Sequence, residues 1–102
     1  MITPSQILKE KKSDVLAIAA KYGAHNVRIF GSVARGDASA KSDIDLLVKL
    51  DRGRTLLDHV RLVRELESLL GCKVDLATEN SLKPGIRDRV LSESVPLHSL
   101  QV

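Results

Sequence analysis

Helical and extended hydrophobic patterns alternate along this chain of 102 residues, and the alternation limits the folds open to it. Apolar residues at helical spacing predict one helix over residues 4–22, one between Thr55 and Gly71, and one over residues 82–92. Alternating or short apolar runs predict strands over residues 27–30, 44–50 and 73–77. We therefore expect an α/β (α+β) fold, with helices around a small sheet, and a single domain over residues 1–102.

Several local signals fix the ends and faces of these elements. Thr3, Pro4 and Gln6 form a capping box with proline in the first helical turn, and Thr55 with Asp58 repeats the capping pattern. The tail at residues 95–97 is expected to pack as an edge piece, because a proline is excluded from a central strand. The apolar residues expected to face the core are Leu56, Val60, Val63, Leu66, Leu69 and Leu70 of the second helix and Ile86, Val90 and Leu91 of the third.

The residue composition narrows the class of partner. Tyr22 and Phe30 are the only aromatic residues, so the core must be aliphatic, and binding of single-stranded nucleic acid by base stacking is disfavoured. The net charge of +3 suits an anionic ligand or partner. It is too small and too scattered for a duplex-binding surface, and no basic helix-turn-helix pattern is present, so we expect no direct DNA binding.

The cysteine, the histidines and the apolar runs of the chain exclude several kinds of site and of protein. Cys72 is the only cysteine, which rules out an intramolecular disulfide and a cysteine-rich zinc site. His25, His59 and His98 show no metal-ligand spacing. The longest apolar run, residues 15–20, is far below the ~20 residues that a membrane helix needs, and no signal-peptide pattern is present. We expect a cytoplasmic protein that does not bind membranes.

Three aspartates are the first candidates for chemistry. Asp43 and Asp45 are two residues apart on a predicted strand, so their side chains share one face, and Asp75 has the same setting on the third predicted strand. If the two strands are neighbours, the three carboxylates meet on one face and repel each other unless a cation lies among them. Oxygen ligands favour Mg²⁺, and a pair of ions ~3.5–4 Å apart suits phosphoryl displacement.

A glycine-serine turn is the second candidate. Gly31 and Ser32 follow the strand at residues 27–30, and backbone N–H groups at such a turn attract phosphate. Arg35 is placed to support the turn or face a phosphate oxygen, and Ser42 to brace the segment before the aspartates. Together these features predict a nucleoside triphosphate site, for nucleotidyl transfer or for γ-phosphoryl transfer. No G-x-x-x-x-G-K-[ST] loop supports the second reaction.

The joint spacing of these residues carries a family resemblance. The chain has a Gly-Ser pair at residues 31 and 32, then ten residues, then Asp43-Ile44-Asp45. This spacing resembles the G-S-x10-D-x-D signature of polymerase-β-like nucleotidyltransferases. The stretches 30–36 and 42–46 look like the minimal nucleotidyltransferase (MNT) branch. The resemblance implies a mixed sheet flanked by helices, dependence on Mg²⁺ and ATP as nucleotide donor.

The same resemblance implies a biological role. MNT proteins are antitoxins that transfer AMP to a tyrosine hydroxyl of a partner toxin, a HEPN-type ribonuclease. It places Asp43, Asp45 and Asp75 as metal-binding carboxylates, with Asp75 also a candidate base. Gly31 and Ser32 take the triphosphate-binding positions. Val33 departs from the pattern, because many relatives carry a basic residue there.

Other functions stay open at this level. The chain could neutralise a toxin by binding alone, with an idle site, or act as a subunit of a small-molecule nucleotidyltransferase. Small-molecule enzymes usually add a second domain for the acceptor, for which 102 residues leave no room. A DNA-binding regulator is the weakest alternative.

Overall fold

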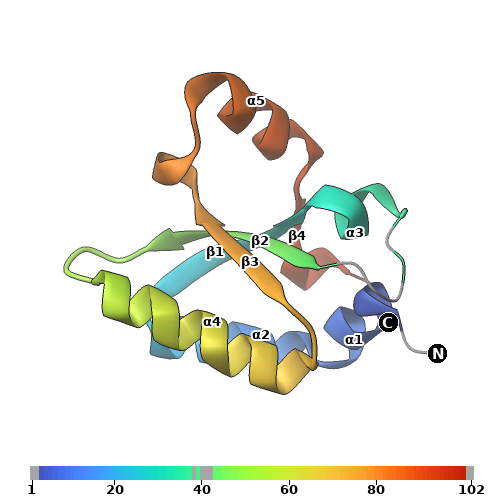
Figure 1. Ribbon diagram of the computed structural model, residues 1–102, viewed down its shortest axis with the longest axis horizontal. Coiled ribbons are helices and arrows are strands. Elements are labelled where there is room, and N and C mark those ends of the chain that lie inside the picture. The colour runs from blue at the N-terminus through green and yellow to red at the C-terminus, as the bar shows by residue number, and fades with distance from the viewer. Residues whose placement is uncertain (1–2, 38, 40–42, 101–102) are drawn as a thin grey trace.

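A computed structural model describes residues 3–37, 39 and 43–100, which form a four-stranded sheet with helices on both faces (Figure 1). The strands are β1 (Ala24–Phe30), β2 (Ile44–Leu50), β3 (Val74–Thr78) and β4 (Val95–Pro96), in the order β3-β2-β1-β4. β2 is parallel to β3, while β1 is antiparallel to both β2 and β4. The sheet is therefore mixed, as the resemblance implies, and the tail forms the expected edge strand.

The helices are α1 (Pro4–Glu10), α2 (Lys12–Lys21), α3 (Gly31–Arg35), α4 (Leu56–Leu70) and α5 (Pro84–Glu93). In Figure 1, α2 and α4 lie side by side below the sheet, and α5 stands above the opposite face. The main core fills the lower layer and is aliphatic, as expected. Its fully buried members include Leu8, Val15, Ile29, Ile44, Leu46, Leu62 and Leu97. No described helix is long and apolar enough to cross a membrane.

The prediction of one helix over residues 4–22 is wrong, because the chain turns at Lys11. Lys11 has φ −106° and ψ 17°, outside the helical range, so α1 ends before it and α2 starts after it. Its N–H still donates to Ile7 O at 2.9 Å, and its carbonyl accepts from Val15 N at 2.9 Å. The bend loses little hydrogen bonding and lets Leu8 and Val15 both become fully buried.

The first strand is longer than the predicted segment 27–30. It begins at Ala24, and its register shifts between His25 and Arg28, which marks a β-bulge. Asn26 lies in the bulge with φ 52°, a left-handed conformation that asparagine tolerates better than most residues. The bulge interrupts the alternation of apolar and polar residues, so the first half of the strand could not be predicted from that alternation.

The expected core stripe of the second helix is partly wrong. The capping box of Thr55 with Asp58 and the left-handed Gly71 bound α4 as predicted. Its fully buried residues are Leu62, Leu66 and Leu70, each four apart, and Leu62 was not among those expected. Leu56 is instead 78% exposed and Val60 39% exposed. Burial begins only at residue 62, so the first two turns of the helix contribute no fully buried side chain to the core.

The last helix starts two residues later than predicted. A 3₁₀ turn, Glu79–Ser81, follows β3, and Pro84 then occupies the first turn of α5. Val90 and Leu91 are half-buried as the pattern suggested, but Ile86, expected to face inward, is 53% exposed. Residues 86 and 90 share a face that borders a pocket above the sheet and is not packed against the core.

Candidate active site

The turn from β1 into α3 brings the backbone directly onto a carboxylate. Gly31 has φ 70°, which only glycine adopts readily, and a Cβ at this position would collide with Oδ2 of Asp45. A side chain at residue 31 would therefore displace the carboxylate or the turn. The Ser32 carbonyl accepts from Asp37 N at 3.0 Å, and Gly36, with φ 81°, ends α3.

The three predicted aspartates lie on neighbouring strands. Asp45 of β2 and Asp75 of β3 are register partners in the parallel pair, so their side chains project from the same face. Asp43 precedes β2 by one residue and lies two residues from Asp45. The condition set from the sequence, that the two strands be neighbours, is met. We refer to Asp43, Asp45 and Asp75 as the carboxylate row.

The electrostatics of Asp45 reflect this crowding. Burial raises the pKa of its carboxyl group above the usual value, and the charges of Asp75 and Asp43 raise that pKa further. The Arg35 guanidinium acts in the opposite direction. Asp45 is therefore a partly desolvated carboxylate with two anionic neighbours, the environment in which a bound cation is favoured.

A pocket of about 600 Å³ opens beside the carboxylate row, between α3 and α5. From the β1–α3 turn and β2 it is lined by Phe30, Gly31, Ser32, Arg35, Asp43 and Asp45. From α5 it is lined by Ile86, Arg89, Val90 and Glu93. Five of the predicted site residues thus share one pocket. Asp75 lines an adjacent groove of about 400 Å³ beside α4, and Ser42 is outside the described residues.

The α5 contribution was missed from the sequence. Ile86, Arg89, Val90 and Glu93 recur at helical spacing, so one face of α5 was predictable, but its target was not. No local pattern in the sequence indicates that this face lies opposite the glycine-serine turn.

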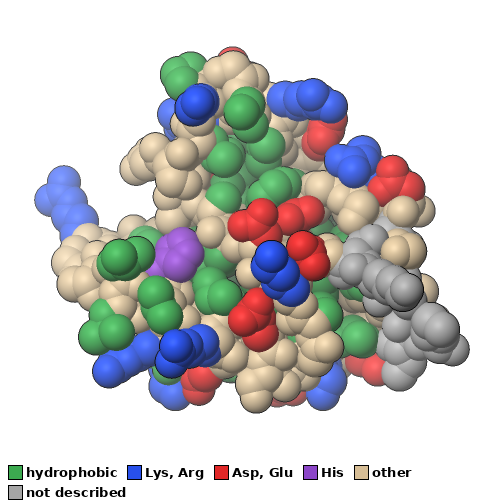
Figure 2. All heavy atoms as spheres, in the orientation of Figure 1, with side chains coloured by type: hydrophobic (Ala, Val, Ile, Leu, Met, Phe, Trp, Pro, Cys, Tyr) green, Lys and Arg blue, Asp and Glu red, His purple; other side chains and the backbone are tan. Residues whose placement is uncertain are grey.

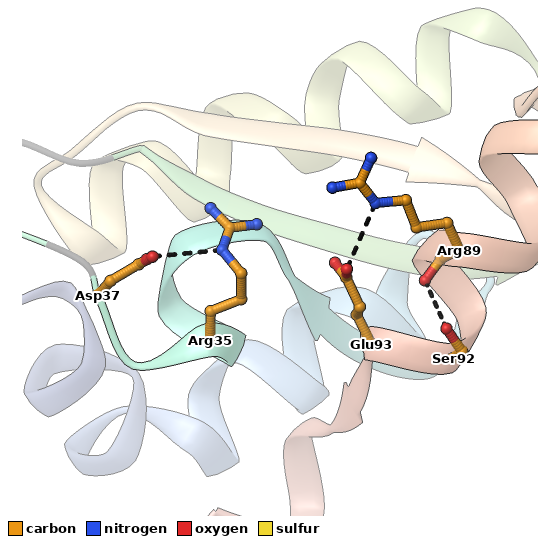
Figure 3. Close-up of polar contacts among 5 residues, drawn as sticks. All are labelled: Arg35, Asp37, Arg89, Ser92 and Glu93. Atoms are coloured by element: carbon orange, nitrogen blue, oxygen red, sulfur yellow. Dashed lines mark hydrogen bonds and ion pairs between the residues drawn. The ribbon is translucent and has the colours of Figure 1, made fainter.

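Two arginines enter the pocket region from opposite sides (Figure 3). Arg35 Nε lies 3.3 Å from Asp37 Oδ2, and Arg89 Nε lies 3.4 Å from Glu93 Oε1. The Arg35 side chain is 49% exposed and that of Arg89 78%, and exposed ion pairs of this kind contribute only ~0–1 kcal/mol. Either arginine can therefore exchange its carboxylate for a more highly charged anion, such as a polyphosphate, at little cost.

Comparison with known proteins decides the family. A model described as "Nucleotidyltransferase domain" matches residues 6–97, nearly the whole chain. The chain belongs to the nucleotidyltransferase family. The expected enzyme class and the mixed, helix-flanked fold are both confirmed.

Relatives place this nucleotidyltransferase in a branch of small enzymes. It is 46% identical over 88 residues to MJ0435 of Methanocaldococcus jannaschii, named provisionally as a protein adenylyltransferase, covering 86% of this chain and 95% of that one. It is 43% identical over 75 residues to "Protein adenylyltransferase MntA" of Thermococcus cleftensis, covering 74% and 76%. A solved structure named provisionally as a minimal nucleotidyltransferase matches with TM-score 0.83 and 50% identity, over 90% of this chain and 94% of that one.

More distant structures share the fold. A toxin–antitoxin structure with AMP-PNP matches with TM-score 0.73 and 22% identity, over 84% of this chain and 71% of that one. A complex of tri-AMPylated Shewanella oneidensis HEPN toxin with MNT antitoxin matches with TM-score 0.64 and 21% identity, over 91% and 71%. The relatives and the fold together confirm the resemblance to the MNT branch that the stretches 30–36 and 42–46 indicated.

The possible metal ligands of this nucleotidyltransferase suit a hard divalent cation. The carboxylate row offers only oxygen ligands, and Asp43 and Asp75 are exposed and free to turn towards Asp45. Within residues 3–37, 39 and 43–100, no three acidic, histidine or cysteine side chains already form a coordinating cluster. Binding would therefore require rotation of the exposed carboxylates towards the half-buried Asp45.

Other polar groups of the nucleotidyltransferase fall outside this arrangement. His25 Nδ1 lies 3.0 Å from Asp51 Oδ1 at the far end of β2, beside a second pocket of about 430 Å³. That pocket holds none of the predicted site residues. Its Lys49 forms an ion pair with Glu79, with 3.7 Å between Nζ and Oε2. Burial, with the charges of Asp43 and Glu67, raises the pKa of the Cys72 thiol, which keeps it protonated and a poor nucleophile.

Proposed function

We propose that this nucleotidyltransferase transfers AMP from ATP to a tyrosine hydroxyl of a HEPN-type toxin, depends on Mg²⁺, and thereby acts as the antitoxin. One observation carries the proposal. The Gly31 turn packs directly on Asp45, the register partner of Asp75, at the edge of a pocket that two arginines flank. This arrangement joins a phosphate-binding turn to a cation-binding row, as attack on a nucleotide phosphate requires.

The proposed reaction is a displacement at the α-phosphorus of ATP. The acceptor oxygen attacks the α-phosphorus of ATP, the bond from that phosphorus to the bridging oxygen of the β-phosphate breaks, and pyrophosphate leaves. Asp75 takes the proton of the acceptor hydroxyl. Asp43 and Asp75 are both exposed, but only Asp75 lies on the side of the row away from the pocket, where the acceptor enters. Arg35 and Arg89 hold the triphosphate from either side.

The carboxylate row would hold one or two Mg²⁺ ions. When bound, magnesium supplies neutralisation of the charge that builds up on the phosphate oxygens. The raised pKa of Asp45 agrees with this assignment, since two neighbouring anions destabilise its charged form until a cation compensates for them.

The relatives support the acceptor class. Two similar proteins carry names of protein adenylyltransferases, and structures of the same fold include an MNT antitoxin bound to a HEPN toxin that carries AMP. A protein acceptor also agrees with the open, exposed setting of Asp75, which a large partner would have to cover.

Intact-mass spectrometry tests the proposal. The chain is incubated with ATP, Mg²⁺ and a HEPN-type toxin, and the mass of the toxin should rise by whole AMP units. The double variant Asp43→Asn with Asp45→Asn should abolish the increase, as should EDTA. Asp88→Asn, an exposed acid on α5 outside the pocket lining, serves as the matched control and should behave as wild type.

A cellular experiment separates catalysis from neutralisation by binding alone. Cells that express the toxin are supplied with the wild-type chain or with Asp43→Ala and Asp45→Ala combined. Loss of protection by a folded variant supports the transferase reaction. Full protection by that variant, with no mass added to the toxin, would show that binding alone suffices.

A further inference from the structure

The start of α4 exposes an apolar surface that the fold does not use. Leu56 is 78% exposed, Leu57 55% and Val60 39%, and together they are most of the large exposed hydrophobic side chains among the described residues. Figure 2 shows hydrophobic side chains gathered over the start of α4, with basic side chains beside them. We call Leu56, Leu57, Val60, Arg61 and Arg64 the α4 patch. Covering such side chains removes apolar surface from water and favours association.

The charges of the α4 patch are positive and unpaired. Arg61 and Arg64 are exposed, and neither forms an ion pair with a carboxylate in the described part of the chain. Neighbouring basic residues are paired: Arg54 Nη1 lies 3.8 Å from Asp58 Oδ1, and Lys21 Nζ lies 3.1 Å from Glu65 Oε1. A partner that fits this surface carries apolar side chains with carboxylates at their border.

The α4 patch continues to the carboxylate row. The groove of about 400 Å³ beside α4 runs from Val60 and Arg64 to Val74 and Asp75 of β3. Asp75 is also the register partner of Asp45, which lines the pocket on the other side of the row. A protein seated on the α4 patch therefore has a direct path along the surface to Asp75, while ATP occupies the pocket.

The mode of docking is limited by the edge strand. β3 lies at the end of the sheet, where a partner strand could add. However, Val74 N–H donates to Glu67 Oε2 at 3.0 Å, and Thr78 N–H donates to Ser81 Oγ at 3.2 Å. These side chains occupy donors at both ends of β3, so the partner contacts α4 and the groove through side chains and does not extend the sheet.

A second copy of this chain fits the surface poorly. In a symmetric dimer the same patch faces itself, which would bring Arg61 and Arg64 of one copy towards those of the other. Like charges at a contact cost binding free energy. The unpaired arginines thus favour an acidic partner over self-association.

We infer that the α4 patch, with the groove that leads to Asp75, is the docking site of the protein substrate, which presents apolar side chains bordered by carboxylates. The inference rests on the proposed function for the identity of that substrate, the HEPN-type toxin. It separates the two substrates, with ATP on the α3–α5 side of the carboxylate row and the protein on the α4 side.

Binding measurements with surface variants test the inference. The dissociation constant for the HEPN-type toxin is measured without ATP for wild type, Leu57→Asp and Arg64→Glu. Both side chains are exposed, so folding should persist, and melting temperature and ATP affinity should match wild type. We expect each variant to bind the toxin at least ~10-fold more weakly, as for loss of a central interface contact. Lys83→Glu, an exposed charge reversal on the opposite side of the sheet, is the matched control and should bind normally.

The outcomes separate this inference from the proposed function. Wild-type affinity in both folded variants would overturn the docking site, even if AMP transfer proceeds. A wild-type homodimer that Leu57→Asp converts to monomer would also overturn it, because the patch would then be a contact between copies. Weakened toxin binding in the variants, together with no AMP transfer by wild type, would support the docking site and contradict the proposed function.

Discussion

At the scale of single residues, the site depends on the contact between Gly31 and Asp45. A positive φ and the lack of a side chain at residue 31 let the turn pass over a partly buried carboxylate. Asp45 in turn lies beside two further acids, and this raises its pKa. The crowding of Asp45 is unfavourable for folding taken alone, which is common where geometry serves chemistry rather than stability.

Gly31→Ala tests the close approach. The added Cβ meets Asp45 Oδ2 and must adopt a left-handed conformation, so we expect a loss of about 1–2 kcal/mol in the free energy of unfolding. AMP transfer should fall far more than stability alone explains. Chemical denaturation and the mass assay measure the two effects. Gly85→Ala, where an added Cβ meets nothing, is the control, and equal effects in both variants would contradict the account.

Asp45→Asn tests the electrostatic strain. Because folding raises the pKa of Asp45, its charged form is less stable in the folded chain than in the unfolded chain. Wild type therefore loses stability as the pH rises through that pKa, and the uncharged variant does not. At neutral pH we expect the variant to melt about 2–5 °C higher, although it is inactive. The gain should vanish in acid, where wild type is also neutral, and a lower melting temperature at pH 7 would refute the assignment.

At the scale of elements, α3 and α5 enclose the pocket although 48 residues of chain, 36–83, separate them. α3 is fixed by the turn at the end of β1, and α5 by the short strand β4 that follows it. Arg28 of β1 donates to Ser94 Oγ at 2.6 Å and to the Ser94 carbonyl at 3.1 Å, at the point where α5 leads into β4. These bonds hold the end of α5 near the sheet, so that Arg89 can face Arg35.

Arg89→Ala tests the role of α5 in ATP binding. Loss of a guanidinium that contacts phosphate should raise KM for ATP on the order of 10-fold and change kcat less. Arg87→Ala, on the same helix but outside this pocket, is the matched control. Steady-state kinetics with saturating toxin measures both parameters, and an unaltered KM in Arg89→Ala would remove α5 from the site.

Paired leucine variants test which face of α4 supports the fold. Leu62 is fully buried and Leu57 is 55% exposed. Leu62→Ala should lower the free energy of unfolding by about 2–5 kcal/mol, while Leu57→Ala should change it by less than about 0.5 kcal/mol. Urea denaturation compares them directly. Similar losses in both variants would mean that the start of α4, around Leu57, also packs against the core.

The elements and the carboxylate row were predictable because both depend on local periodicity. Asp43, Asp45 and Asp75 were located from the period-2 pattern of their strands, and the parallel pairing then brought them together. Features that depend on tertiary contacts were not predictable. The turn at Lys11, the bulge at Asn26 and the exposed start of α4 each break a local pattern for reasons that lie elsewhere in the fold.

At the scale of the whole molecule, the carboxylate row lies between two surfaces of different character. On one side is the pocket with Arg35 and Arg89, which suits a polyphosphate. On the other is the groove from Asp75 to the α4 patch, which suits a protein. In the proposed reaction, the nucleotide and the protein acceptor reach the same row of carboxylates from these two surfaces.

Isotope tracing tests this account most directly. The chain, Mg²⁺ and the HEPN-type toxin are incubated with ATP labelled at the α-phosphorus, and in parallel with ATP labelled at the γ-phosphorus. The account predicts that the α-label appears on the toxin in wild type and not in the Asp43→Asn, Asp45→Asn variant, while the γ-label leaves as pyrophosphate. Transfer of the γ-label to the toxin, or no transfer of either label by a folded wild-type chain, would contradict it.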